Sequence, residues 1–471
     1  MKESELLQRH TYFDYGDVNE KMDQRRMCFD QVSRHRFQLF SFIAVSIASL
    51  VLTIYHIKAN PKLVIPEYSE ELLKRTNMFS QIRRKLFAWD RIKNECLSGA
   101  LKGNLRYQIK DSCIDGREKA VKIAKKRLAV TVTSGAYARY RKCKGNNSAP
   151  LKLYRLAPKI FNEVPDNFLE QYENPCWRHK GSHVYCLPYF YVIGMPKCGS
   201  SDLFDKLTSH PQIIRPKWKE PGFWNKLHYI RQPHDLGVYM EYFKDFREAI
   251  QTSKRKLITG DGTVASMWSL FDVQFLKDGV GFGLPDVLKA IQPEAKFFII
   301  LRDPVERLFS DYHYFGDFRR TPEDFHRKVL IALQEFHKCK QRLNDDLACI
   351  GVERIWSKDC IARVSLGLYS VLLREWFKVF PANQFFVIDL AVWESDCVGV
   401  MTRAYQFLAL DPIPEDELKV ICAKRTVLSG KRTKIIMGNE TRHLLNCLYG
   451  PYQQDLRAFL STHSLDERNL V

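Results

Sequence analysis

No two cysteines in this sequence are separated by two residues, although the chain contains 13 cysteines. Because that spacing is typical of zinc-binding loops, its absence argues against a zinc site of the usual kind. Acidic residues are also few relative to basic ones, with 54 Asp and Glu against 73 Lys and Arg and a formal net charge of +19. This imbalance favours a polyanionic partner, which can be nucleic acid, an anionic membrane or an acidic polysaccharide.

Long apolar runs are scarce as well, since only residues 37–57 are uncharged over a length that spans a bilayer as a helix. No small-residue cleavage site follows this run, which predicts an uncleaved signal anchor rather than a signal peptide. Arg34 and Arg36 precede it and favour a cytoplasmic N-terminus. A buried soluble helix is the alternative, because several serines dilute the run. We therefore expect a cytoplasmic tail over residues 1–36 and a lumenal chain from residue 58.

Cysteines in a secretory lumen meet an oxidising environment, so disulfides are expected in the lumenal chain. Twelve of the 13 cysteines follow the apolar run. Cys176 and Cys186 are spaced to close a short loop, and one pair is expected among Cys339, Cys349 and Cys360. The sequence leaves the rest of the connectivity open.

Residues 58–185 are expected to form an ordered, mostly helical region. The stretches "MFSQIRRKLFAWDRI" and "REKAVKIAKKRLAV" have helical spacing of apolar residues with basic opposite faces. These faces either are simply solvated or extend a track for an anionic polymer. Two tripeptides match the N-glycosylation pattern, at Asn146 and Asn439, in agreement with a lumenal location.

Residues 186–471 alternate between short apolar stretches and amphipathic segments. "YFYVIG", "KLITGDG", "KFFIILRDP" and "FFVIDL" are candidate buried strands, and "SSDLFDKLTSH" has helical spacing. This alternation predicts an α/β fold with a parallel sheet covered on both faces. Functional residues in such folds lie at the carboxyl ends of the strands, which is where the polar motifs occur.

The first motif, "GMPKCGSS", follows an apolar strand and is similar to a phosphate-binding loop. Gly194 and Gly199 permit a tight turn, and backbone N–H groups at the start of the next helix bind an anion. An ATPase loop would place its lysine after Gly199, whereas this loop contains Lys197 inside it, so a kinase or ATPase is disfavoured. A strand-to-helix turn with an exposed lysine is the structural alternative. The candidate anion-binding residues are Lys197, Cys198, Gly199, Ser200 and Ser201, with Cys198 expected as a packed thiol.

The second motif is "FFIILRDPVERLFSDY". Asp303 suits a helix N-cap, Pro304 suits the first helical position and Glu306 suits a capping box, so structure alone explains these three residues. Helix capping does not explain Arg302 at the strand end or Ser310 two turns into the helix. These two residues together suit a phosphate clamp. An ordinary surface ion pair is the alternative for Arg302.

These two motifs resemble the 5′-phosphosulfate and 3′-phosphate elements of Golgi carbohydrate sulfotransferases, which use 3′-phosphoadenosine 5′-phosphosulfate (PAPS). The resemblance covers roughly residues 155–471 and extends to "KEPGFW" and "GLYSVLLREWFKVFP". It implies a P-loop-like PAPS-binding fold, a type II Golgi membrane protein and PAPS as co-substrate, with Lys197 acting on the departing phosphate and no metal required. The likeness is greatest to the branch that sulfates the 6-hydroxyl of N-acetylgalactosamine 4-sulfate, which implies chondroitin or dermatan sulfate as acceptor.

The resemblance also implies roles on the acceptor side. The glutamate of "KEPGFW", Glu220, serves as the base in such enzymes, although an exposed Lys–Glu turn is the structural alternative. Lys217 and Lys219 are expected at the mouth of the site, where they meet sulfate and uronate groups. Asp261 and Thr263 in "GDGT" are secondary acceptor-side candidates.

The loop "LSGKRTK" is similar to the segment that folds over the nucleotide 3′-phosphate, which assigns Lys431 and Arg432 to the donor; a solvated basic turn is the alternative. The sequence as a whole predicts a membrane-anchored sulfotransferase that acts on a glycosaminoglycan and not on nucleic acid. A tethered glycosaminoglycan-binding protein without turnover is the alternative from another class. The oligomeric state is not predicted.

Overall fold

The computed structural model describes residues 158–179, 181, 183–224, 236–269, 283–315, 320–356, 362–424, 435–463, 465 and 469–470. The predictions for residues 1–157, including the apolar run and Asn146, lie outside these ranges, as do those for Lys431 and Arg432. Within the ranges, no helix is long and apolar enough to cross a membrane. The domain boundaries expected after residues 36 and 57 therefore stay predictions.

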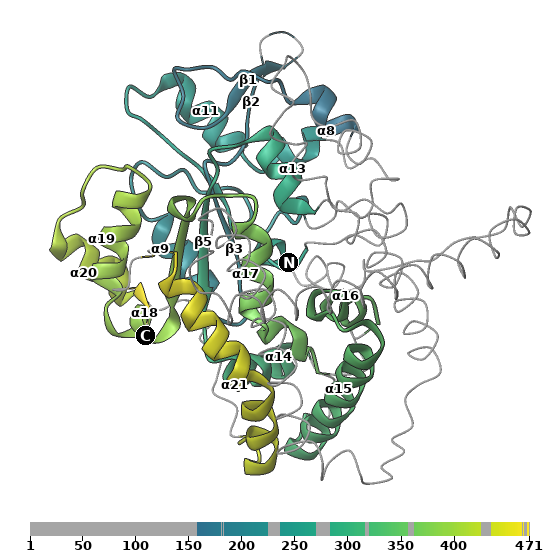
Figure 1. Cartoon of the computed structure of the whole chain (residues 1–471). Coiled ribbons are helices and arrows are strands. Elements are labelled where there is room, and N and C mark those ends of the chain that lie inside the picture. The colour runs from purple at the N-terminus through teal and green to yellow at the C-terminus, as the bar shows by residue number, and fades with distance from the viewer. Residues whose placement is uncertain are drawn as a thin grey trace, which may run out of the picture. The chain divides into compact units, whose positions relative to one another are not determined.

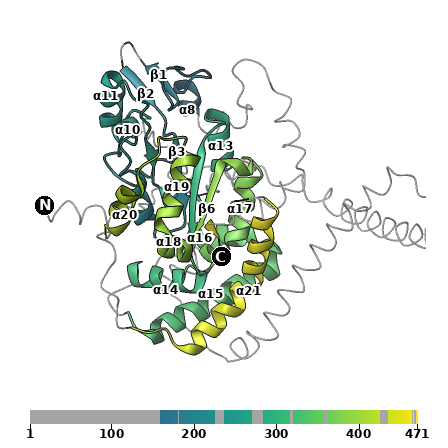
Figure 2. The same cartoon turned by 90° about the vertical axis from the view of Figure 1, so that its left-hand side faces the viewer.

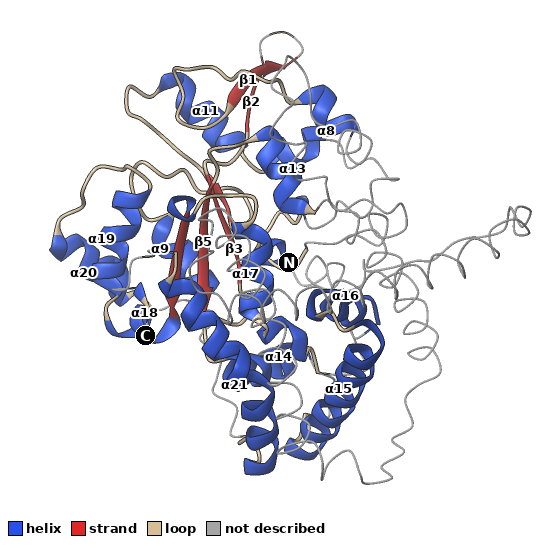
Figure 3. Cartoon of the chain, in the orientation of Figure 1, coloured by secondary structure: helices blue, strands red, loops and turns tan. Residues whose placement is uncertain are grey.

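A four-stranded parallel sheet forms the centre of the described part (Figures 1 and 3). Its order is β4 (Gly260–Asp261), β3 (Phe190–Gly194), β5 (Lys296–Leu301) and β6 (Phe385–Asp389). Every pairing in this sheet is parallel. The prediction of an α/β fold with a parallel sheet is confirmed, and each predicted strand contributes one member of the sheet.

Helices cover both faces of the sheet, and successive side chains of β5 show why. Phe297 packs on Trp376 of α17 (Tyr369–Phe377), with ring centroids 5.1 Å apart. Its neighbour Phe298 packs on Phe407 of α19 (Cys397–Phe407), at 5.3 Å. Because alternate residues of a strand point to opposite faces, α17 and α19 cover opposite sides. Burial on both sides accounts for the continuous apolar strand sequences.

The remaining elements extend from the two ends of the sheet. In both views the hairpin β1–β2 and α8 lie at one end, and α14 and α15 lie at the other (Figures 1 and 2). The further elements are α8 (Pro158–Glu163), β1 (Cys176–His179), β2 (His183–Cys186), α9 (Ser200–Leu207), α10 (Leu236–Glu241), α11 (Lys244–Thr252), η3 (Val264–Ser266), α13 (Leu284–Ile291), α14 (Pro304–Phe315), α15 (Pro322–Leu343), α16 (Asp346–Trp356), η4 (Val364–Gly367), η5 (Ala382–Gln384), α18 (Leu390–Ser395), α20 (Glu415–Ala423) and α21 (Asn439–Ser461).

Disulfides connect neighbouring elements as expected for an oxidising compartment. The predicted Cys176–Cys186 bond closes the β1–β2 hairpin, and Cys339–Cys349 is the pair formed within the predicted group of three. The bond from Cys397 to Cys422, which links α19 to α20, was not predicted.

Candidate functional site

The topology of the sheet places one crevice at the carboxyl ends of β3 and β5. The chain passes from β3 to β4 on one side and then crosses to β5 on the other side, so it changes direction between β3 and β5. Ligands of open parallel sheets bind at such a switch point. The loop with Lys197 follows β3 and Arg302 follows β5, so both predicted donor motifs lie at this point.

The loop backbone is shaped by Gly199, which caps the N-terminus of α9. Gly199 has φ of +87°, and a Cβ atom at this position would lie 2.8 Å from Cδ1 of Leu390. A glycine is therefore required here both by conformation and by space. Ser200 and Ser201 begin α9, so their N–H groups belong to the free first turn of a helix, which attracts anions.

The side chain of Lys197 lies against an aromatic ring at the end of α14. Its Nζ is 3.8 Å from the centroid of the Tyr314 ring. Burial lowers the pKa of Lys197 from its ordinary value; Asp311 opposes this change, and the positive charges of Arg302 and Arg363 add to it. The ammonium is thus partly desolvated among other cations, an environment that favours the approach of an anion.

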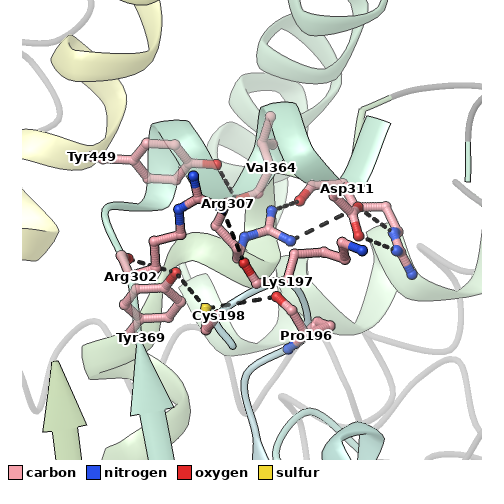
Figure 4. A network of polar contacts seen from close by, with 10 residues as sticks. Pro196, Lys197, Cys198, Arg302, Arg307, Asp311, Val364, Tyr369 and Tyr449 are labelled. Atoms are coloured by element: carbon pink, nitrogen blue, oxygen red, sulfur yellow. Dashed lines mark hydrogen bonds and ion pairs between the residues drawn. The ribbon is translucent and has the colours of Figure 1, made fainter. Parts of the chain in front are cut away.

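Cys198 is a buried thiol, as predicted, and is free. Its Sγ lies 3.9 Å from the Tyr369 hydroxyl, and burial raises its pKa to about 12 (Figure 4). The thiol therefore stays protonated and its side chain points into the core. Only the backbone of Cys198 remains for a ligand contact.

Arg302 links the end of β5 to the glycine loop. Its Nη1 donates to the Lys197 carbonyl at 3.4 Å, and its own carbonyl accepts from the Tyr369 hydroxyl at 3.0 Å (Figure 4). Asp303 caps α14 through the N–H groups of Val305 and Glu306, at 2.8 and 3.1 Å, which confirms the predicted cap.

Glu306 differs from the capping-box prediction, because its carboxylate accepts from Arg442 of α21 at 2.6 Å and lies 4.0 Å from Arg302. Two guanidinium groups compete for this carboxylate, so it turns toward α21 rather than back to the cap. Ser310 lies further along α14 and is partly exposed. The phosphate-clamp assignments of Arg302 and Ser310 stay predictions.

A buried ionic cluster behind Lys197 was not predicted from the sequence. Arg307 is fully buried and donates from Nη2 to the Arg363 carbonyl at 2.9 Å, while its Nη1 lies 3.8 Å from Asp311 (Figure 4). Arg363 binds both carboxylate oxygens of Asp311, through Nε at 2.8 Å and through Nη2. The spacing of four residues between Arg307 and Asp311 is a signal for an ion pair on a helix. Nothing local in the sequence reveals the third member, which lies 52 residues away from Asp311.

Glu220 lies on an exposed turn whose backbone is fixed by the loop after β4. Its carboxylate is 45% exposed and pairs with Lys219 Nζ at 2.8 Å. The Gly262 N–H donates to the Lys219 carbonyl at 2.9 Å, and the Gly222 N–H donates to the Thr263 hydroxyl at 3.1 Å. The contact between Glu220 and Lys219 is the one expected for an exposed Lys–Glu turn. Because the carboxylate is also exposed to solvent, the role of Glu220 as the base stays a prediction. Lys217 is exposed on the same turn.

Asp261 and Thr263 lie beneath this turn and are 1% and 2% exposed. Asp261 accepts from the Tyr239 hydroxyl at 2.7 Å and from the Thr263 N–H at 2.8 Å, and Tyr239 in turn accepts from Trp224 Nε1 at 3.0 Å. Burial raises the pKa of Asp261 to about 6, although these hydrogen bonds work in the opposite direction. These contacts support the turn that carries Glu220, and direct contact of Asp261 or Thr263 with an acceptor stays a prediction.

A cavity of about 380 Å³ adjoins the loop at the carboxyl ends of β5 and β6. Arg302 and Leu390 line it, and the same two residues approach Lys197 and Gly199 of the loop. Arg457 of α21 contributes a further positive charge. Within the described ranges no group of three or more His, Cys, Asp or Glu side chains is arranged to hold a metal ion.

The fold and the site together define a class. A helix N-terminus, a lysine within the glycine loop and an arginine at the end of the next strand are suited to a donor with more than one phosphate-like group. This is the equipment of a transferase with an anionic donor.

Comparison with known proteins identifies the family. The chain belongs to the sulfotransferase domain family, whose model matches residues 188–441. It is 32% identical over 365 residues to rat carbohydrate sulfotransferase 15, a match covering 70% of this chain and 64% of that protein. The human protein of that name is 30% identical over 355 residues, covering 68% and 63%. Human bifunctional heparan sulfate N-deacetylase/N-sulfotransferase 3 is 26% identical over 334 residues, covering 66% and 33%.

Among solved structures, a sulfotransferase from Alicyclobacillus acidocaldarius is 20% identical to this chain with a TM-score of 0.38, and the match covers 59% of this chain and 96% of that one. The chain matches less than two thirds of the length of rat carbohydrate sulfotransferase 15. The prediction from the sequence that this chain belongs to the carbohydrate sulfotransferases is therefore confirmed, both for the family and for the enzyme class.

Proposed function

We propose that this protein transfers a sulfuryl group from PAPS to a hydroxyl of a glycosaminoglycan sugar. The single observation that carries the proposal is the position of Lys197. It lies inside the glycine loop at the start of α9, where its carbonyl is hydrogen-bonded by Arg302 at 3.4 Å. Charge that develops on the departing phosphate would meet an ammonium and the free N–H groups of a helix, with no metal required.

The donor would be held at two ends. The 5′-phosphosulfate is assigned to Lys197 and to the backbone N–H groups from Cys198 to Ser201, and the 3′-phosphate to Arg302 and Ser310. Lys431 and Arg432 are assigned to the same phosphate on the strength of the sequence alone. We place the adenosine in the adjoining cavity, because 380 Å³ falls within the usual range for small-molecule sites.

The reaction would be a direct displacement at sulfur. The acceptor hydroxyl oxygen forms a bond to sulfur, and the bond between sulfur and the phosphate oxygen breaks. Glu220 takes the hydroxyl proton, and Lys197 stabilises the negative charge that builds on the phosphate oxygen. The products are a sulfate ester and 3′,5′-ADP. Before it can act as base, Glu220 has to loosen its 2.8 Å contact with Lys219.

The proposed acceptor is N-acetylgalactosamine within chondroitin or dermatan sulfate, at the 6-hydroxyl, with a 4-sulfate already present in some acceptors. The relatives named carbohydrate sulfotransferase 15 and the net charge of +19 support a polyanionic glycan, and the exposed Lys217 and the partly buried Lys219 are assigned to it. We also propose a single-pass type II Golgi membrane location, with residues 37–57 as anchor and Asn146 and Asn439 as glycosylation sites. Asn439 is exposed, as such a site requires.

Two alternatives have specific support. A different carbohydrate acceptor is favoured by the 26% identity to a heparan sulfate enzyme. A glycan-binding protein without turnover is favoured by the 2.8 Å contact between Glu220 and Lys219, because that contact gives the carboxylate a role other than that of a base. Both alternatives make predictions that differ from ours in a transfer assay.

The test is a pair of substitutions that separate catalysis from donor binding. Glu220→Gln should lower turnover by roughly two to four orders of magnitude, the usual contribution of a general base, while 3′,5′-ADP binding persists. Lys197→Ala should abolish turnover and also weaken 3′,5′-ADP binding. Glu241→Gln is the matched control, because Glu241 is likewise exposed and paired, with Arg247 at 2.8 Å. If Glu220→Gln keeps near-normal turnover, Glu220 is not the base and its turn is structural.

A further inference from the structure

The backbone of Lys197 has an unusual conformation, and its side chain is directed at α14. The φ angle of Lys197 is +65°, in the left-handed region that residues other than glycine rarely occupy. The loop is anchored to β5, because Arg302 donates to the Lys197 carbonyl at 3.4 Å and the Met195 N–H donates to the Ile300 carbonyl at 2.8 Å. Figure 4 shows the Lys197 side chain directed toward Asp311 of α14. Backbone strain of this kind is typical of functional sites, where the surrounding structure holds a residue in place.

The ammonium group of Lys197 lies over the ring of Tyr314, near the end of α14. The distance from Nζ to the ring centroid is 3.8 Å, well inside the roughly 6 Å limit for a cation–π contact. Among the residues that the structure describes, no carboxylate forms an ion pair with this ammonium. Asp311 approaches it, but Arg363 binds both oxygens of that carboxylate. The contact that holds the charged end of Lys197 is therefore aromatic.

Tyr314 lies on the same face of α14 as a residue assigned to the donor. Ser310 and Tyr314 are four positions apart, a spacing that makes two side chains neighbours on a helix. Tyr314 is also 59% exposed, so its ring is open to solvent and not part of the core. The contact between Tyr314 and Lys197 thus lies on the donor side of the crevice.

The charges around Lys197 explain why an aromatic partner suits this lysine. Burial lowers its pKa, Asp311 and Cys198 act in the opposite direction, and the positive charges of Arg302 and Arg363 add to the lowering. An aromatic face attracts a cation through its quadrupole, which favours the charged form of the amine. A carboxylate in the same place would favour that form too, but it would repel an anionic donor. A neutral ring stabilises the ammonium without this repulsion.

We propose that Tyr314 is a positioning residue for sulfuryl transfer, whose ring holds the ammonium of Lys197 charged and in place beside the donor. The inference rests on the proposed function, because it takes Lys197 as the group that stabilises the departing phosphate. The attraction comes from the ring face, so the Tyr314 hydroxyl is not required. Tyr314→Phe should therefore behave as wild type. Tyr314→Leu keeps an apolar side chain over the lysine but removes the ring, and should not.

The first measurement is the pKa of Lys197 in the full-length chain without substrates. Acetic anhydride reacts with the uncharged amine only, so labelling of the peptide that contains Lys197, followed by mass spectrometry across a pH series, reports this pKa. Tyr314→Leu should lower the pKa by about 0.4–1.5 units, the equivalent of one cation–π contact. Tyr314→Phe should leave it unchanged.

The second measurement is the pH dependence of turnover with PAPS and chondroitin sulfate. Transfer needs the charged lysine, so the alkaline limb of the kcat profile should move to lower pH in Tyr314→Leu by the same amount as the labelling pKa. At the optimum, kcat should fall by about 2- to 30-fold, while the KM for the acceptor stays within about twofold. Tyr314→Phe should restore both the limb and kcat.

Phe315→Leu is the matched control. Phe315 is adjacent in the sequence and 57% exposed, and its ring lies over a different cation, Arg363, at 4.4 Å. This control should leave the pKa of Lys197 and kcat unchanged, whereas a general loss of aromatic packing would affect both leucine variants. Titration with 3′,5′-ADP confirms that each variant is folded.

The inference is overturned if Tyr314→Leu leaves the pKa of Lys197 unchanged, or if Phe315→Leu lowers it equally. It is also overturned if Tyr314→Phe loses as much as Tyr314→Leu, because the hydroxyl and not the ring would then act. A lowered pKa with an unchanged kcat profile would show that the contact has no role in transfer. If wild type binds 3′,5′-ADP but sulfates no glycan, the proposed function is wrong, and the labelling still decides whether Tyr314 holds Lys197.

Discussion

Gly199→Ala should damage the donor loop by an amount that the structure allows us to work out. The residue has φ of +87°, and placing a residue other than glycine there costs roughly 1–2 kcal/mol. The new Cβ would lie 2.8 Å from Cδ1 of Leu390, so that side chain must leave its rotamer at a cost of about 0.5–1.5 kcal/mol. The sum is a destabilisation of about 1.5–3.5 kcal/mol, measurable by thermal or denaturant unfolding.

The same change should weaken nucleotide binding, because it moves the N–H groups at the start of α9 and pushes on Leu390, which lines the adjoining cavity. Calorimetry with 3′,5′-ADP should show at least a tenfold loss of affinity. Gly351→Ala in α16 is the matched control, since a Cβ there meets nothing within 4 Å. This control should be neutral or stabilising and should leave binding unchanged. If Gly199→Ala destabilises the fold but binds 3′,5′-ADP normally, the loop does not hold the donor phosphates.

Three further predictions concern pH, salt and nucleotide selectivity. Folding raises the pKa of Asp261 from 3.8 to about 6, so the protonated carboxyl stabilises the folded state below pH 4. This stabilisation, at most about 3 kcal/mol, is lost as the pH rises to about 6. Unfolding measured as a function of pH should show this loss in wild type, and Asp261→Asn should flatten that part of the profile. The Michaelis constant for a polymeric acceptor should rise steeply with salt, because interactions between exposed charges are screened over about 8–10 Å at moderate ionic strength. The Michaelis constant for PAPS should change less. If steady-state kinetics show the same salt dependence for both substrates, the basic surface does not recruit the acceptor. Binding of 3′,5′-ADP should be much tighter than that of 5′-AMP and insensitive to EDTA, and equal affinities in calorimetry would remove Arg302 from the 3′-phosphate.

The central sheet was predictable because its strands are buried on both faces. "YFYVIG" and "KFFIILRDP" read as continuous apolar runs, and the structure places β3 and β5 within them. The cap at Asp303 was equally local, since an Asp-Pro pair at a strand end has a direct physical reading. These features depend on residues that are adjacent in the sequence.

Features that depend on distant residues were missed. The Arg363 contact with Asp311 joins positions 52 apart, and the Cys397–Cys422 bond could not be selected among the remaining cysteines. The sequence also did not predict that Asp261 is buried under the Glu220 turn, because this burial depends on Tyr239, which lies 22 residues away. A polar motif at a strand end indicates where a site lies, whereas tertiary contacts decide which side chains face outward.

The most direct measurement is transfer of labelled sulfate from PAPS, in the presence of EDTA, to a panel of defined glycosaminoglycans, followed by disaccharide analysis. The account predicts label on the 6-hydroxyl of N-acetylgalactosamine in chondroitin or dermatan sulfate, formation of 3′,5′-ADP in equal amount, and no label with Lys197→Ala. Label in no glycan, from a protein that still binds 3′,5′-ADP, would contradict the account and leave a glycan-binding protein without turnover.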